Sequence, residues 1–459
     1  MPVFRPLTKP ALALAGVLAL TGCSTSKAAT EETHRTWRNA EVNAVSRAAV
    51  AAGVATVTSM TPDGSLETAA LDLSSGKKLW AHPAEIAGRL PGMGVQPPAA
   101  VQTNPGQTTP GQAVVAAVAP AGPGGKGRTW NATLVARDAR TGRQLWTRPV
   151  HSTFGPQPCG GRLCLSENTA LASARMVVLD PLTGAVLWKV PGIAEVEWSD
   201  SSKVVMLHLA THPVLASHDV KTGKPAWRLP VEQALSPGVD LSGGWAFGAS
   251  GGDLVGYVAP YTPPGKKKAS SFGLFSVALA DGTVNWLRPS VVRVYPSGSP
   301  GYAPVVRPVD ERGQYGGFAR LDPVSGRVLG QITADQVPGT GWWLAFPGDM
   351  ARLDFLKPGA SGAAFELPSG RPTPVGGRRG WSFCVTDPKP LPLAGTPGGF
   401  YSVASLCEFD LATGKRVPGS GAPPVWFTGG QDGWRLWRDE KGALNAVEDA
   451  KATAPGMYG

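Results

Sequence analysis

The chain has 459 residues, of which 42% are hydrophobic and 17% charged, and this balance excludes an intrinsically disordered protein. The 59 glycines and 44 prolines fit a fold with many turns and short strands. The net charge of +10 falls to about +8 (10 − 2) once residues 1–22, with Arg5 and Lys9, are removed. This excess favours anionic partners such as lipid headgroups or wall polymers, and the alternative is simply a solvated surface.

The amino terminus predicts export. Arg5 and Lys9 flank "ALALAGVLAL" at 11–20, an apolar run of the length found in signal peptides. The following "LTGC" at 20–23 resembles a bacterial lipobox. We therefore predict a signal peptide at 1–22, a lipid on Cys23, a tether at 23–40 and an extracytoplasmic location on the outer face of the cell membrane. The alternative is an ordinary secretory signal with an accidental cysteine, and either signal argues against nucleic acid as a partner.

One phrase then recurs along the chain. "VLDPLTGAVLWKVP" at 178–191 has close copies at 70–83, 136–149, 217–230 and 277–289, and weaker copies at 320–330, 365–374 and 408–419. Each is an apolar run, a D-x-x-[ST]-G corner and a second short run. Asp and Ser/Thr side chains bond the backbone of such corners, and Gly supplies the positive φ that closes a hairpin. The phrase predicts a β-hairpin.

Tryptophan follows the corner glycine by four residues in the five close copies, at Trp80, Trp146, Trp188, Trp227 and Trp286. An even offset along a strand puts each ring on the same face relative to its turn. One hairpin cannot bury such a ring, so we expect a neighbouring copy to cover it. Most copies lie about 40 residues apart, the size of one four-stranded propeller blade.

These copies resemble the PQQ-like repeat of quinoprotein-type β-propellers, over roughly residues 50–450. The family includes quinoprotein alcohol dehydrogenases and the propeller lipoprotein of the outer-membrane β-barrel assembly machinery. The resemblance implies an all-β fold, a single propeller spanning 41–459. The last three copies depart from it, with Gly330, Pro374 and Pro418 where Trp would stand.

The two ends of the chain predict ring closure. Residues 433–449 read as two strands that lack a Trp strand, and residues 34–42 read as a Trp strand that lacks its hairpin. Pairing them would leave no free sheet edge. We predict eight blades, with seven or nine as alternatives. Two Pro/Gly-rich inserts, near 88–128 and 259–271, are predicted loops, and the second carries Lys266, Lys267 and Lys268.

The remaining four cysteines fit an oxidising compartment. Cys159 and Cys164 flank a Gly-Gly turn, and Cys384 and Cys407 are expected on neighbouring strands of one blade. We predict two disulfides, with reduced buried thiols as the alternative. No C-x-x-C or paired Cys/His spacing indicates zinc.

Signals for catalysis are weak. A PQQ- and Ca²⁺-dependent dehydrogenase of the family would commonly carry adjacent cysteines, and neither Cys-Cys nor C-x-x-C-H occurs. The G-x-S-x-G match at Ser250 lacks a following helix. His208, His212 and His218 are spaced along an apparent strand, where positions four apart lie about 13 Å from each other, too far for one metal ion unless Pro213 folds the chain back.

The sequence therefore predicts a membrane-anchored, non-enzymatic interaction scaffold of the cell envelope without cofactor or metal. Its partner is expected to be an envelope protein or a wall polymer. The alternatives are a PQQ/Ca²⁺-dependent dehydrogenase and a binder of an anionic wall polymer or small ligand.

Overall fold

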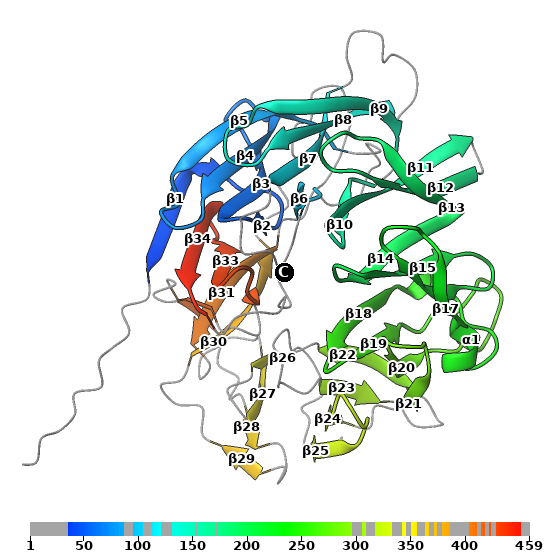
Figure 1. The fold of residues 1–459 in the computed structure, drawn as a ribbon. Coiled ribbons are helices and arrows are strands. Elements are labelled where there is room, and N and C mark those ends of the chain that lie inside the picture. The colour runs from blue at the N-terminus through cyan, green and yellow to red at the C-terminus, as the bar shows by residue number, and fades with distance from the viewer. Residues whose placement is uncertain are drawn as a thin grey trace, which may run out of the picture. The chain divides into compact units, whose positions relative to one another are not determined.

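In the computed structural model of the chain, the described residues are 35–86, 95–103, 112–120, 131–152, 154–170, 173–295, 305–308, 317–332, 342–345, 350–355, 363–366, 371–373, 379–385, 404–410, 415–417, 422–423 and 428–450. The predicted signal peptide and Cys23 lie outside these ranges. The described part is almost entirely antiparallel β-sheet (Figure 1). It contains no helix that is long and apolar enough to span a membrane.

The first four complete sheets take consecutive strands in order, as the hairpin repeat predicts. They are β2 (Ala49–Ala51), β3 (Val54–Met60), β4 (Leu66–Asp72) and β5 (Lys78–Ala84); β6 (Ala99–Gln102), β7 (Ala113–Ala119), β8 (Asn131–Asp138) and β9 (Gln144–His151); β10 (Gln157–Cys159), β11 (Arg162–Ala170), β12 (Ser173–Leu179) and β13 (Val186–Pro191); and β14 (Ile193–Ser199), β15 (Lys203–Leu209), β16 (Val214–Asp219) and β17 (Pro225–Pro230).

Two short helical segments, α1 (Val231–Ala234) and the 3-10 turn η1 (Leu241–Gly243), precede the next sheet. The following sheets are β18 (Trp245–Ser250), β19 (Asp253–Val258), β20 (Gly273–Ala278) and β21 (Val284–Pro289); β22 (Val291–Tyr295), β23 (Val305–Pro308), β24 (Phe318–Leu321) and β25 (Val328–Ile332); β26 (Trp342–Ala345), β27 (Met350–Phe355), β28 (Ala363–Glu366) and β29 (Arg371–Thr373); and the three-stranded β30 (Arg379–Val385), β31 (Ala404–Asp410) and β32 (Arg416–Val417).

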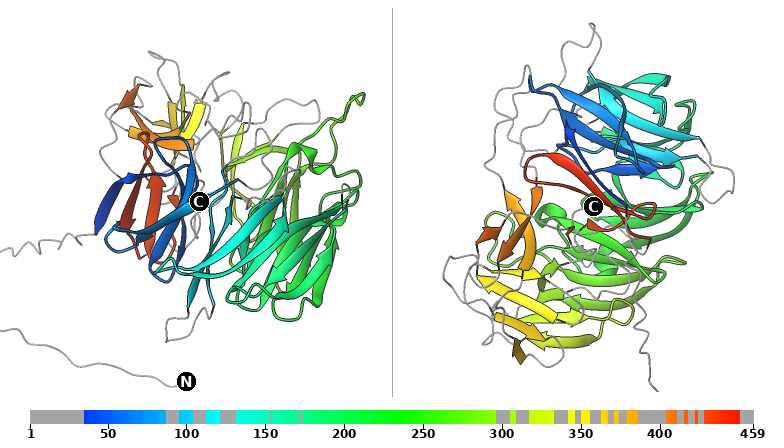
Figure 2. Two further views of the ribbon diagram at one scale, coloured as in Figure 1. Left: turned by 90° about the horizontal axis from the view of Figure 1, so that it is seen from above. Right: turned by 90° about the vertical axis from the view of Figure 1, so that its left-hand side faces the viewer.

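The last sheet joins the two ends of the chain. Strand β1 (Thr36–Asn43) pairs with β34 (Ala443–Glu448), which pairs with β33 (Trp434–Arg438). The blue β1 accordingly lies beside the red β34 and β33 in Figures 1 and 2. Ring closure by the two ends is therefore as the sequence predicts, and the fold is a β-propeller. The described residues form nine sheets. This number equals the alternative of nine rather than the predicted eight, because the composite sheet comes in addition to one sheet for each of the eight repeat copies.

Two predicted boundaries are wrong. The predicted tether extends to residue 40, but β1 already begins at Thr36 and pairs with β34, in agreement with the Trp strand predicted at 34–42. The predicted loop at 88–128 contains β6 and β7, the first two strands of a sheet. Their short Ala/Val runs lie between Pro/Gly-rich segments, which hid them in the sequence.

The hydrophobic core is divided into layers between consecutive sheets. One layer joins Leu134 and Val150 of the second sheet to Leu163 and Val177 of the third, and similar layers separate the neighbouring pairs of sheets. This arrangement explains the near-continuous apolar runs of the middle strands, because both faces of each sheet are covered.

The repeat tryptophans connect the layers. Each of the five indole N–H groups donates to a backbone carbonyl in the corner of the next sheet, at 2.8–3.1 Å. Each ring also lies against the corner glycine there: a Cβ built on Gly142 would stand 2.7 Å from Cγ of Trp80. Trp37 on β1 packs against Gly76 in the same way and donates its indole N–H to Leu73 O, so it is a sixth member of the set.

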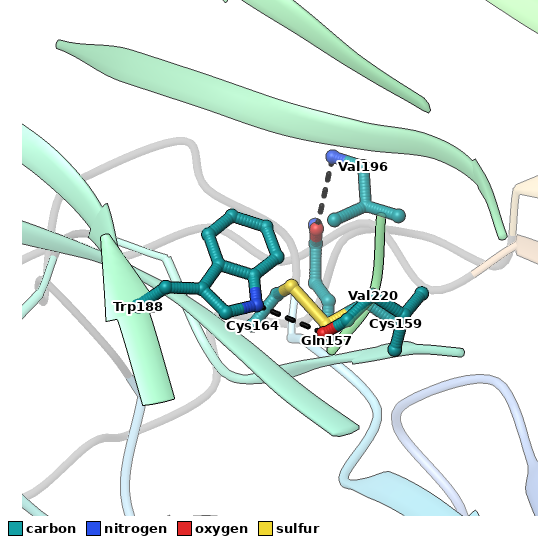
Figure 3. The surroundings of a disulfide bond; sticks show 6 residues. All are labelled: Gln157, Cys159, Cys164, Trp188, Val196 and Val220. Atoms are coloured by element: carbon teal, nitrogen blue, oxygen red, sulfur yellow. Dashed lines mark hydrogen bonds between the residues drawn. A yellow bond between two sulfur atoms is a disulfide. The ribbon is translucent and has the colours of Figure 1, made fainter. Parts of the chain in front are cut away.

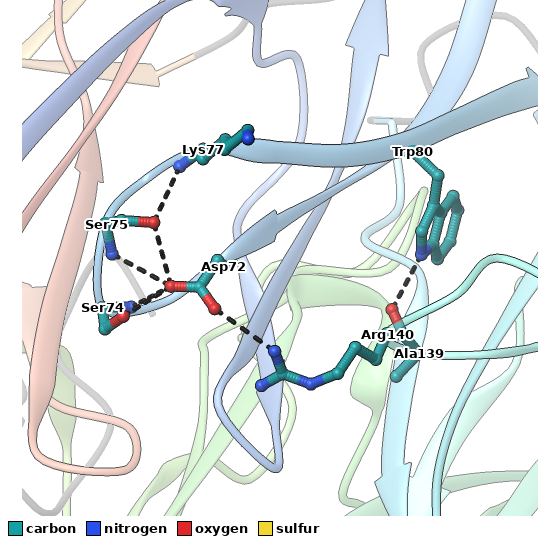
Figure 4. A network of polar contacts seen from close by, with 7 residues as sticks. All are labelled: Asp72, Ser74, Ser75, Lys77, Trp80, Ala139 and Arg140. Atoms are coloured by element: carbon teal, nitrogen blue, oxygen red, sulfur yellow. Dashed lines mark hydrogen bonds and ion pairs between the residues drawn. The ribbon is translucent and has the colours of Figure 1, made fainter.

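The Asp side chain closes each corner from within. In Figure 4, the carboxylate of Asp72 accepts hydrogen bonds from the backbone and hydroxyl groups of Ser74 and Ser75, and the second oxygen pairs with Arg140 of the next sheet. The pKa of Asp72 is held below its usual value, chiefly by the hydrogen bond from the Ser74 hydroxyl. The same bonding recurs at Asp138, Asp180, Asp219 and Asp322.

Candidate functional site

The residues singled out in the sequence fall at several places. Cys159 and Cys164 form a disulfide across the β10–β11 turn, beside Trp188 and its acceptor Val220 (Figure 3). Cys407 on β31 is also disulfide-bonded. Cys384 lies on the adjacent β30, two positions from the register partner of Cys407, but its side chain is outside the described residues, so this second pairing stays a prediction.

Ser250 ends β18 and is followed by the two glycines of a tight turn into β19, so no helix follows it. The histidines are rearranged by the β15–β16 hairpin. His212 is exposed at its turn, whereas His208 and His218 lie on the two strands with ring centroids 5.7 Å apart. The chain folds back just before Pro213. This fold-back is the condition, predicted from the sequence, for the histidines to approach one another, and His208 and His218 do so.

One surface feature of the described residues is an open groove of about 560 Å³, which we call the lysine groove. Three connections build it: β15–β16, β17–β18 with α1 and η1, and the predicted insert between β19 and β20. It is lined by Thr211, His212, Glu232, Gly238, Val239, Asp240, Pro263, Lys266, Lys267, Lys268, Ala269 and Ser270. In antiparallel sheets these connections lie at the end opposite the Asp-Gly corners.

The insert is held in place by hydrogen bonds from its backbone and from one side chain. Ser271 N–H donates to Gly238 O at 3.0 Å, its hydroxyl donates to Pro237 O at 2.6 Å, and Ala259 N–H donates to Gly244 O at 2.9 Å. Within the insert, Ser270 N–H donates to Tyr261 O at 2.7 Å. The loop that carries the three lysines is therefore fixed against the β17–β18 connection by specific hydrogen bonds.

In the lysine groove the carboxylates have hydrogen-bond partners within the protein, whereas the lysines have no ion-pair partner among the described residues. Glu232 accepts from Gly238 N–H at 3.1 Å and contacts His212 Nδ1 at 3.3 Å, and Asp240 accepts from Ser242 N–H at 2.9 Å. The hydroxyl and N–H of Ser242 hold the pKa of Asp240 below its usual value. The three lysines are exposed, and among the described residues none has an ion-pair partner. The charge left for a ligand is positive.

A pair of half-buried carboxyls on β14 was missed in the sequence. Glu195 and Glu197 lie two positions apart on this strand, and Trp245 Nε1 of the next sheet donates to Glu197 Oε1 at 3.0 Å. Burial raises the pKa of both, that of Glu197 to about 8. The alternation of Glu and apolar residues in "IAEVEWS" was a sign of a strand with one polar face, but not of burial by a neighbouring sheet.

The described residues do not assemble the calcium site that a quinoprotein dehydrogenase needs. No three His, Cys, Asp or Glu side chains converge in the described part of the chain. The Glu195–Glu197 pair supplies two carboxyls, and Glu197 is protonated near neutral pH and occupied by Trp245. A hard cation prefers six or more oxygen ligands, with ionised carboxylates among them, so this pair does not fit Ca²⁺.

The comparisons with known proteins agree with the repeat pattern. Residues 17–190 match the family PQQ_2, described as outer membrane protein assembly factor BamB. No curated protein matches the chain. Among solved structures, BamB from Moraxella catarrhalis is similar with 13% identity and a TM-score of 0.43, over 90% of this chain and 98% of that one.

Quinohemoprotein alcohol dehydrogenase from Comamonas testosteroni is similar with 12% identity and a TM-score of 0.41, over 85% of this chain and 78% of that one. A europium-containing methanol dehydrogenase is similar with 11% identity and a TM-score of 0.37, over 73% and 79%. The family match covers residues 17–190, less than half of the chain, and agrees with the repeat pattern there, so the chain is similar to the PQQ-like repeat family of β-propellers.

Proposed function

We propose that this protein is an extracytoplasmic lipoprotein, anchored through Cys23, whose propeller is a non-enzymatic scaffold in the cell envelope. The lysine groove would bind an acidic segment of a partner protein. The observation that carries this proposal is the set of three lysines without ion-pair partners in the described structure, on a loop held by hydrogen bonds beside a concave surface.

The chemistry of the lysine groove favours a peptide-like ligand. Its acidic members, Glu232 and Asp240, accept backbone hydrogen bonds within the protein and form no ion pair with the lysines in the described structure, and three lysines against two carboxylates leave a positive balance. The lining also offers Pro263 for apolar contacts, whereas both backbone polar groups of Gly238 are already bonded within the protein. Solvent-exposed ion pairs contribute about 0.2–1 kcal/mol each, so the lysines would mainly set orientation, association rate and salt sensitivity.

The family match supports a scaffold, because the matching family is described as an assembly factor. The anchor is supported by the sequence alone, through the lipobox-like "LTGC" at 20–23. Replacing Cys23 with Ala should release the protein from membranes into the soluble extracytoplasmic fraction. Retention on the membrane would contradict the anchor and leave the lysine groove untouched as a hypothesis.

The groove is tested by in-cell photocrosslinking with the crosslinker at Ala269. The triple variant Lys266→Glu, Lys267→Glu, Lys268→Glu should lose the crosslinked protein, and the yield for the unmodified chain should fall with salt. The control variant Lys77→Glu, Lys221→Glu, Lys224→Glu has the same charge change on exposed turns outside the groove and should keep it. Equal yields from both triple variants would refute the groove, and crosslinking to wall polymer instead of protein would show the wrong partner class.

A further inference from the structure

The histidine pair between the third and fourth complete sheets is unused by the proposed function. In the β15–β16 ladder, His208 is opposite Val214 and His218 is opposite Val204, so the two residues lie on the same face and four register positions apart. That spacing corresponds to about 13 Å along the strands. The ring centroids are nevertheless 5.7 Å apart, so the two side chains lean toward each other.

Both rings have an orphaned nitrogen. The Nε2 atoms of His208 and His218 are buried and have no hydrogen-bond partner, and His218 as a whole is 3% exposed. The Nδ1 atom of His218 lies 3.1 Å from the carbonyl oxygen of Gly223. A carbonyl only accepts, so Nδ1 carries the proton and Nε2 presents a lone pair. Histidines that bind metals are commonly oriented by such a bond from the other ring nitrogen.

The surroundings of the pair are soft and apolar. The ring of Trp188 stacks on His218 with centroids 5.8 Å apart, and Met206, Met176 and the Cys159–Cys164 disulfide fill the same layer. Desolvation lowers the pKa of both histidines, that of His208 to about 4, so both rings are neutral at pH 7. Arg228 on β17 is the cationic side chain that acts on both rings.

We propose that His208 and His218 bind one monovalent soft metal ion, Cu(I), through their Nε2 atoms. A metal–imidazole bond of about 2 Å on each side would place the two ring centroids roughly 6 Å apart in a near-linear site. The observed 5.7 Å is close to that separation. Two-ligand coordination suits Cu(I), and thioether and aromatic surroundings favour it over harder ions.

Charge and ligand number argue against a divalent ion at the same place. Zinc takes four ligands in a closed site, and the described residues bring no third His, Cys, Asp or Glu to this pair. The positive charge of Arg228 opposes any cation, and it opposes a divalent ion twice as strongly as a monovalent one.

The test uses Ag(I) as a redox-inert probe for Cu(I), added to the full chain with Cys23→Ala so that this thiol cannot compete. We expect one Ag(I) per chain and coupled shifts of two of the six histidine side chains in ¹⁵N-histidine spectra. His208→Ala should weaken binding at least tenfold, whereas His212→Ala, at the exposed turn of the same hairpin, should not change it. His208 is the partly exposed member of the pair, so its variant should fold even if His218→Ala does not.

Three results would overturn the proposal. The first is no binding at micromolar Ag(I). The second is equal affinity for His208→Ala and His212→Ala, which would place the ion elsewhere. The third is tighter binding of Zn(II) than of Ag(I), which would contradict a two-coordinate monovalent site.

Discussion

The approach of a tryptophan ring to a corner glycine is the contact on which the stacking of sheets depends, and Gly142→Ala tests it. Gly142 has φ +70°, and its Cβ would stand 2.7 Å from Cγ of Trp80. The left-handed backbone should cost about 1–2 kcal/mol for Ala. Overpacking against the ring should add about 1–3 kcal/mol. We expect a total loss of roughly 2–5 kcal/mol in the free energy of unfolding.

Gly53→Ala is the matched control. Gly53 has φ +71°, but its Cβ would meet only the Arg140 guanidinium, at 3.7 Å. This variant should lose the backbone contribution alone, about 1–2 kcal/mol. The measurement is urea denaturation of both variants, comparing midpoints at equal m-values. Equal losses would refute the ring contact as the reason for glycine. In a Trp80→Ala background, Gly142→Ala should cost no more than Gly53→Ala does.

Three further predictions concern neighbouring sheets. Trp188→Ala should lower the free energy of unfolding by at most about 3–5 kcal/mol, because the deleted aromatic ring is only partly buried, and a negligible loss in urea denaturation would contradict its role as a wedge. The pKa of Glu197 is raised from 4.5 to about 8, so its contribution to the stability of the folded state is fully present below pH 4.5 and is lost as the pH rises through about 8. Glu197→Gln should therefore be more stable than the unmodified chain at pH 9, by less than about 5 kcal/mol, and its free energy of unfolding should change less with pH. The exposed Glu41→Gln is the control, and identical pH profiles for the two variants would refute the assignment. The pKa of His208 is lowered from 6.5 to about 4, so the chain should lose stability as the pH falls from 6.5 to 4. Because the ring is partly exposed and therefore screened, we expect a loss of about 1–2 kcal/mol. His208→Phe should remove that loss, and an unchanged dependence of stability on pH between 6.5 and 4 would contradict this prediction.

The hairpins and their order along the chain were readable in the sequence because their causes are local. Asp72 and its counterparts bond backbone groups two and three residues away, and Gly76 closes the corner in the same short segment. The four-residue step from glycine to tryptophan is also local. Even the closure of the ring could be predicted, because each end of the chain carries an incomplete part of the same repeat.

The strands inside the predicted insert could not be found in this way. The runs that became β6 and β7 are four and seven residues of Ala, Val and Gln, with no corner motif of their own. Their neighbours in the sheet decide that they are strands, since a short apolar run fits several structures until something covers both of its faces.

The sequence by itself determined an all-β chain of repeated hairpins and the positions of the wedge tryptophans, and it predicted an export signal. Only the tertiary structure decided what those residues contact. It showed that the corner glycines are needed for the close approach of an indole from the preceding sheet, as well as for their backbone angle. It also brought the loop of Lys266, Lys267 and Lys268 against the β17–β18 connection, paired Glu197 with Trp245 and turned His208 toward His218. Each of these contacts joins separate strands or sheets, and a one-dimensional pattern records the spacing of residues along a strand but not which side chains meet across it.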